Sequence, residues 1–185
     1  ECFANAQIIL GNIEDDISIS VMWGETNSQN DGIIKRDVHF PETPLDLIYS
    51  GPHIYGGNPL FKTSRRICEN NSHFDNIDLI NIKDNYLQRC NYSPKCSLNE
   101  YINRISITPW GKKYNDTYRV LSREMLNLAG ERTLDSAIVP PKAGHIHTII
   151  GVALKKQLDI PLCGAYFVSL PFDFFVIVTG REHLN

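Results

Sequence analysis

The stretch ISISVMW, residues 17–23, decides the fold class because apolar and polar side chains alternate along it. Successive side chains of a β-strand point to opposite faces, so this alternation predicts a half-buried strand. Gly24 ends the pattern, and the polar run from Thr26 to Gly32 is expected to form a hairpin or a loop.

Two later segments, residues 133–139 and 147–154, also predict strands, and Pro140–Pro141 stops the first of them. Between 116 and 129 the pattern instead predicts an amphipathic helix, with Asp116 as its N-cap and Gly130 as its stop. The apolar stripe of this helix is Tyr118, Leu121, Met125 and Leu128. Arg119 and Arg123 lie four residues apart, so a helix would place both on one face beside the stripe.

Two apolar helices are predicted near the end of the chain, from Pro161 through Leu170 and from there to Thr179, and we expect both in the core. Residues 67–113 read as a long irregular region that its aromatic side chains keep ordered. The predicted fold class is therefore mixed α+β: a small mixed or antiparallel sheet, a basic amphipathic helix and C-terminal packing helices.

The 185 residues, 42% of them hydrophobic, suit a single domain over residues 1–185. Because the chain begins at Glu1 and stops just after an apolar run, we expect a fragment of a longer protein. No run of about 18 uncharged apolar residues predicts a membrane span, so we expect a cytoplasmic location. Five cysteines without a CxxC pair favour reduced thiols. A zinc site would have to combine Cys68, His73, Cys90 and Cys96, which lack paired spacing, so we expect no metal.

Charge is distributed unevenly along the chain. Residues 1–61 carry nine acidic and two basic side chains, a net −7, whereas residues 62–132 carry twelve basic and eight acidic ones, a net +4. A basic middle in an acidic protein can attract a polyanion such as nucleic acid, although a solvated surface has the same composition.

Catalytic motifs are incomplete or missing. Asn58-Pro59-Leu60-Phe61 approaches the Asn-Pro-Pro-aromatic motif of adenine-N6 methyltransferases, but Leu60 replaces the second proline and no Gly-x-Gly turn follows a predicted strand. Cys163 beside His145 or His147 is a weak candidate nucleophile, since a lone cysteine in Pro-Leu-Cys-Gly-Ala is more often a small buried hydrophobe. We therefore expect neither a catalytic site nor a cofactor site in this segment.

The remaining polar set suits DNA, because lysine and arginine neutralise phosphates while arginine, serine and histidine also read base edges. Its members are Lys62, Thr63, Ser64, Arg65, Arg66, Lys112, Lys113, Arg119, Arg123, Lys142, His145 and His147. The segments 62–66 and 142–147 are expected to read bases, and Lys112, Lys113, Arg119 and Arg123 to contact phosphates.

Four sequence blocks together resemble the specificity half of large bacterial adenine-N6 DNA methyltransferases, of the type IIG-like restriction-modification and phage-defence class. These blocks are GPHI with GNPLFKTSR (residues 51–65), YR and REM (118–125), ERTL through AIVPP and HIH (131–147), and SLPFDFF (169–175). The order of the blocks matches over roughly residues 45–185, and residues 1–44, a candidate N-terminal lobe, match only loosely.

The resemblance implies a target recognition domain that positions double-stranded DNA for a methyltransferase domain of the same chain in a bacterial cytoplasm. That absent domain would bind S-adenosylmethionine and methylate a flipped adenine. The Phe172-Asp173-Phe174 helix would join the two domains. Two alternatives stay open: a nuclease lobe using Asp75, Asp78 and Lys83, and a protein-interaction module.

Overall fold

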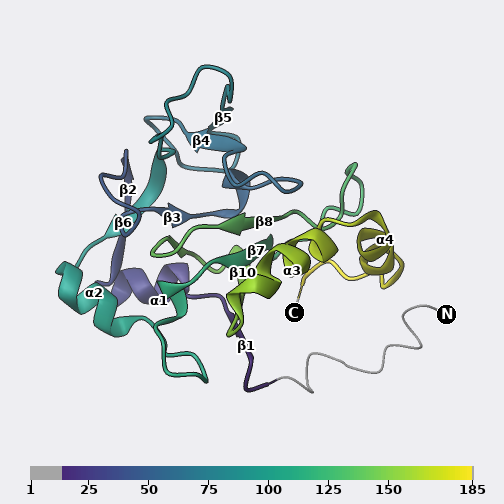
Figure 1. The fold of residues 1–185 in the computed structure, drawn as a ribbon. Coiled ribbons are helices and arrows are strands. Elements are labelled where there is room, and N and C mark those ends of the chain that lie inside the picture. The colour runs from purple at the N-terminus through teal and green to yellow at the C-terminus, as the bar shows by residue number, and fades with distance from the viewer. Residues whose placement is uncertain (1–13, 185) are drawn as a thin grey trace.

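A four-stranded antiparallel sheet forms the centre of the computed structural model, which describes residues 14–184. The strand order is β1 (Ile17–Ser20), β10 (Ile149–Leu154), β7 (Arg119–Arg123) and β8 (Ser136–Val139). Ile17 pairs with Leu154 and Arg119 pairs with Val139, so the first and the last thirds of the chain meet in this sheet (Figure 1).

Three two-stranded ribbons lie beside the sheet (Figure 1). The antiparallel pairs are β2 (Ile34–His39) with β6 (Cys90–Pro94) and β4 (Lys62–Ser64) with β5 (Phe74–Asn76). The parallel pair is β3 (Ile48–Tyr49) with β9 (Gly144–His145). Together with the central sheet, these ribbons confirm the predicted α+β class with small sheets.

The helices are short. They are α1 (Glu25–Asn30), α2 (Leu98–Arg104), α3 (Ile160–Phe167) and α4 (Leu170–Val178), with 3-10 turns at Gly51–His53, Tyr114–Asp116 and Gln157–Asp159. The Ser97 side chain caps α2 by accepting a hydrogen bond from the Glu100 amide. The prediction of a hairpin or loop over residues 26–32 is wrong, because α1 occupies most of it.

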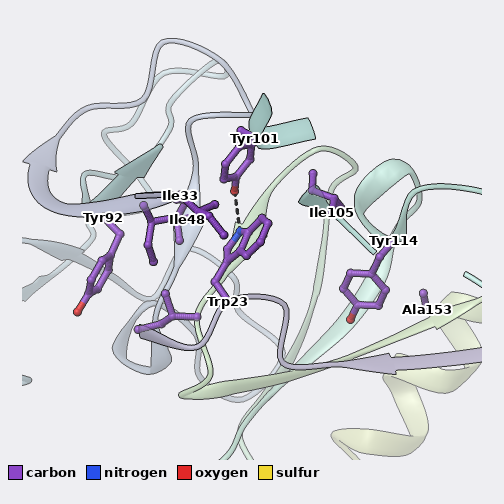
Figure 2. Close-up of a cluster of buried hydrophobic side chains, with 10 residues drawn as sticks. Trp23, Ile33, Ile48, Tyr92, Tyr101, Ile105, Tyr114 and Ala153 are labelled. Atoms are coloured by element: carbon purple, nitrogen blue, oxygen red, sulfur yellow. Dashed lines mark hydrogen bonds between the residues drawn. The ribbon is translucent and has the colours of Figure 1, made fainter. Parts of the chain in front are cut away.

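Two hydrophobic clusters meet at the β3–β9 ribbon. Ile48 belongs to the cluster around Trp23, whose indole N–H donates to the Tyr101 hydroxyl at 2.9 Å (Figure 2). The neighbouring Tyr49 belongs to a second cluster, which includes Leu121 of the central sheet. Because adjacent residues of β3 face different clusters, this ribbon ties the sheet to the rest of the molecule.

The predicted strands at 17–23, 133–139 and 147–154 are confirmed as β1, β8 and β10, each shorter than expected. The predicted helix at 116–129 is wrong. Residues 119–123 form β7, with partners on both sides, and of the expected apolar stripe only Leu121 is buried. Pairing with two neighbouring strands has therefore overridden a local pattern of helical period.

The two C-terminal helices exist as predicted, but the prediction that they belong to the core is wrong. On α3 and α4 the side chains of Leu162, Leu170, Phe174 and Val178 are all more than 60% exposed. Asp173 anchors α4 from its inner side, where its carboxylate accepts hydrogen bonds from the amides of Thr133 and Leu134. The outer surface of both helices is thus apolar and uncovered.

Among the described residues no single helix has the length and hydropathy needed to cross a membrane. Only the bent pair Gln157–Phe167 and Leu170–Val178, taken together with its 61° break, passes that test of length and composition.

Candidate nucleic-acid interface

Arg119 was predicted to contact phosphate from an exposed helical face, but in β7 its side chain is completely buried. Its Nη2 donates to the Ala143 carbonyl at 2.5 Å, and its guanidinium lies 5.2 Å from the centre of the Tyr114 ring. Burial lowers the pKa of Arg119, while the surrounding tyrosines act in the opposite direction. This arginine is a part of the core and does not belong to the candidate interface.

Arg123, the second predicted phosphate contact on this segment, is also held inside the protein. Its guanidinium donates to the carbonyls of Gly51 and Ile54 and forms a 3.1 Å ion pair with Asp135, whose side chain is 2% exposed. Burial raises the pKa of Asp135, and the nearby Arg123 acts against that shift. Arg123 therefore fastens β7 to the 51–54 turn.

His145 and Ser64, two predicted DNA contacts, are fully buried as well. Burial lowers the pKa of His145 to about 3, and the charge of Arg119 adds to this, so the ring is neutral at physiological pH. The core closes tightly here because β10 carries Gly151, where a Cβ atom would collide with the Tyr114 hydroxyl and His145. Direct base contact by His145 or Ser64 is incompatible with this packing.

The rest of the 62–66 segment remains at the surface. Lys62 lies over the Phe61 ring, Thr63 accepts a hydrogen bond from the Arg89 amide, and Arg65 pairs with Asp75 across the β4–β5 ribbon at 2.8 Å. Arg66 is exposed and forms no ion pair with any described residue. Lys62 and Arg66 therefore stay available to a ligand, whereas Arg65 is engaged by Asp75.

A small polar cavity of about 80 Å³ lies where the β4–β5 connection meets the 146–148 turn, and none of residues 62–66 lines it. Residues 68–71, in the connection that follows Arg66, line one side of it, and Ile146 and Thr148 line another. Between the latter two, exposed His147 accepts a hydrogen bond from the amide of Glu25, which itself lines the cavity. The β4–β5 connection and the 146–148 turn thus meet at one site.

The other predicted phosphate contacts lie on a different part of the molecule. Lys112 and Lys113 belong to the segment between α2 and β7, at the bottom of Figure 1, whereas β4 and β5 are at the top. Lys113 donates to the carbonyls of Asn103 and Ile105, and Lys142 pairs with Asp116 of the neighbouring 3-10 turn. The predicted cationic set therefore does not converge on one surface.

Five cations in the described part of the chain form neither an ion pair nor a hydrogen bond from their charged groups: Lys62, Arg66, Lys83, Lys95 and Lys112. Three of them lie between residues 62 and 83, although Lys83 lines a pocket separate from the cavity. This lobe, residues 62–83, carries four basic and three acidic side chains, a net +1.

Asn58 makes a local turn. Its side-chain oxygen accepts a hydrogen bond from the Leu60 amide, and Gly56 and Gly57 before it have positive φ angles of 49° and 91°. Phe61 stacks on Tyr55 with 4.8 Å between ring centres. The resemblance to a base-binding methyltransferase motif therefore corresponds here to a self-contained turn.

The residues of the nuclease alternative also have local roles. Asp78 accepts hydrogen bonds from the Ile80 amide and the Asn81 side chain, which lower its pKa, and Asp75 holds Arg65. Within residues 14–184 no group of three or more His, Cys, Asp or Glu side chains is arranged to hold a metal ion. Cys163 lines an apolar groove on α3, and burial raises its pKa, which disfavours a reactive thiolate.

Sequence reasoning missed Glu25 and Arg36 at this site. They lie eleven positions apart in the acidic first third of the chain, and no motif connects them. No protein-family description, curated protein or solved structure matches this chain.

Proposed function

We propose that this chain is a DNA target recognition module, which positions duplex DNA for adenine-N6 methylation by an S-adenosylmethionine-dependent domain of the same polypeptide. The observation that carries the proposal is the meeting of the β4–β5 connection and the 146–148 turn around one polar cavity. Each loop overlaps a segment predicted from the sequence to read bases, 62–66 or 142–147, although of those two segments only Ile146 lines the cavity. Phosphate contacts position a protein on DNA, and polar side chains in the grooves read its sequence.

The charge distribution supports the same surface. Lys62, Arg66 and Lys83 lie in the lobe that lines the cavity, and none of them is neutralised by a carboxylate. The proposed interface is therefore smaller than the predicted one.

The salt dependence of duplex binding tests this proposal. The double variant Lys62→Ala/Arg66→Ala is expected to reduce the slope of log affinity against log salt by about 1.8, since each phosphate contact contributes about 0.9. Fluorescence anisotropy of a labelled duplex, titrated with the 185-residue chain at several salt concentrations, measures this slope.

The matched control is Lys95→Ala/Lys112→Ala, which removes two equally uncompensated cations outside the lobe. Its slope should equal that of the unmodified chain. Equal losses in both double variants would indicate non-specific attraction, and absence of salt-dependent binding by the unmodified chain would overturn the proposal.

The apolar outer surface of α3 and α4 favours a second role, protein interaction. Large exposed apolar patches mark contact sites, and here Leu162, Leu170, Phe174 and Val178 all point away from the core. We place the methyltransferase domain of the same polypeptide on this surface, consistent with the joining role expected for the Phe172-Asp173-Phe174 segment. Leu162→Glu/Phe174→Glu should weaken binding of a separately produced methyltransferase domain in calorimetry while leaving duplex binding unchanged.

A further inference from the structure

The cavity between the β4–β5 connection and the 146–148 turn contains a fixed arginine. Arg36 of β2 donates through Nη1 to the Glu69 carbonyl at 3.1 Å, and through Nη2 to the Tyr92 hydroxyl at 2.9 Å and to Glu25 Oε1 at 3.0 Å. The guanidinium carbon also lies 5.5 Å from the centre of the Tyr92 ring. These partners come from three separate segments, so the side chain is held before any ligand arrives.

Glu25, at the start of α1, has one oxygen engaged and one available. Its Oε1 accepts from Arg36 and from the Tyr92 hydroxyl, whereas its Oε2 has no hydrogen-bond partner among the described residues. The atom is not sealed off either, because the Glu25 side chain is 26% exposed and lines the cavity.

The carboxylate stays ionised under ordinary conditions. Partial burial acts to raise the pKa of Glu25, but the hydrogen bonds from Tyr92 and Arg36 outweigh it and the pKa is lowered. An ionised carboxylate can only accept hydrogen bonds, so its matching ligand group is an N–H donor.

The lining also limits the kind of ligand. Asn70, Asn71, Asn91 and Thr148 surround the charged pair, and the space of about 80 Å³ admits the edge of a planar polar group but not a whole chain segment. In the DNA major groove the amino groups of cytosine (N4) and adenine (N6) are the donors displayed by base edges, and glutamate commonly accepts from cytosine N4.

We propose that Glu25 Oε2 accepts a hydrogen bond from the exocyclic amino group of a cytosine and thereby fixes one position of the DNA target. Arg36 and Tyr92 are positioning residues, which hold the carboxylate in place. This inference rests on the proposed function, because it assigns a base-reading group to the same surface. It adds two residues, Glu25 and Arg36, that lie outside the predicted recognition segments.

Enrichment of bound sequences from a randomised duplex pool tests the inference. With the unmodified 185-residue chain we expect a preference for cytosine at one position, and Glu25→Gln should reduce that preference about tenfold, because an amide group presents donors beside the acceptor. Arg36→Lys should reduce it partially. Neither change should alter the salt slope, which depends on the phosphate contacts of Lys62 and Arg66.

The matched control is Glu42→Gln, which alters an exposed glutamate that does not line this cavity. Its base preference should be that of the unmodified chain.

A measurement on the unmodified chain remains decisive even if Glu25→Gln does not fold. N4-methylcytosine at the preferred position should weaken binding about tenfold, whereas 5-methylcytosine there should not, because only the first modification blocks the amino group. Duplex binding with no cytosine preference, or a preference that Glu25→Gln leaves unchanged, would overturn this inference alone. Failure of the unmodified chain to bind any duplex would overturn the proposed function itself.

Discussion

The segments 62–66 and 119–123 have similar charge in the sequence and opposite positions in the structure. Each carries two arginines, and each was predicted to contact DNA. In β4 and the residues after it, Lys62 and Arg66 reach the surface, whereas in β7 Arg119 is buried and Arg123 is bound to carbonyls and to Asp135. A basic side chain therefore indicates a ligand contact only where the protein offers it no internal partner.

The difference arises from the number of neighbouring strands. β7 lies between β10 and β8, so both of its edges are paired, and four of its five residues are buried. Its arginines must therefore find partners inside the protein. β4 is paired only with β5 in a peripheral ribbon. Charged side chains on a central strand form contacts inside the protein, whereas those on an outer ribbon can stay exposed to solvent.

The largest effect that separates the two segments is expected for Arg123→Ala. The change leaves the carboxylate of Asp135 buried without its partner, so the free energy of unfolding should fall by about 4 kcal/mol. Urea denaturation measures it. Arg66→Ala, the exposed counterpart, should change stability by less than about 0.5 kcal/mol. A similar small loss for both variants would show that Arg123 is not the internal fastener described here.

A second prediction concerns the pH dependence of folding stability, which buried histidines control. His53 is fully buried. Its Nδ1 accepts from the Ser50 amide, while Nε2 faces the Arg89 carbonyl and so carries the ring proton. Burial lowers its pKa to about 4, and that of His145 to about 3. In the unfolded chain both histidines bind a proton near pH 6.5, whereas in the folded chain they stay neutral to a much lower pH. Their contribution to folding stability is therefore fully present above pH 6.5 and is lost as the pH falls toward 4.

Each of these two histidines should cost about 2 kcal/mol at pH 5 relative to pH 7.5, since one pKa unit corresponds to about 1.4 kcal/mol. His53→Gln should therefore remove roughly half of the loss attributable to the pair. Denaturation curves at the two pH values provide the measurement, and an equally steep loss in His53→Gln would contradict the assignment.

The sequence predicted three of the four strands of the central sheet, because alternation over 17–23 and the paired prolines at 140–141 are local signals. It failed at residues 116–129, where an apolar spacing of helical period coincides with a strand held by two neighbours. It also failed at α3 and α4, whose apolar composition predicted burial although the structure leaves their outer faces uncovered. Local patterns contain no information on which partner, if any, covers a face.

The candidate site was predicted only in part, for the same reason. Segments 62–66 and 142–147 were identified from residue type, and Lys62, Arg66 and His147 remain candidates. Glu25 and Arg36 became visible only when β2, β6 and α1 were placed together around the cavity. A pair assembled from separate elements has no spacing that a sequence pattern could detect.

The smallest expected effect on stability comes from Asp75→Asn, which breaks the exposed ion pair with Arg65. Both side chains are more than half exposed, so unfolding free energy should change by less than about 1 kcal/mol. Arg65 then becomes a further free cation of the lobe, and the salt slope of duplex binding should steepen by about 0.9.

Asp116→Asn is the matched control, because it releases Lys142 on the part of the molecule away from the lobe. Its slope should stay unchanged. If both variants steepened the slope equally, net charge alone would explain the binding. If Asp75→Asn instead abolished a magnesium-dependent cleavage of DNA by the unmodified chain, the nuclease alternative would replace target recognition, since a carboxylate that only pairs with Arg65 has no part in such a reaction.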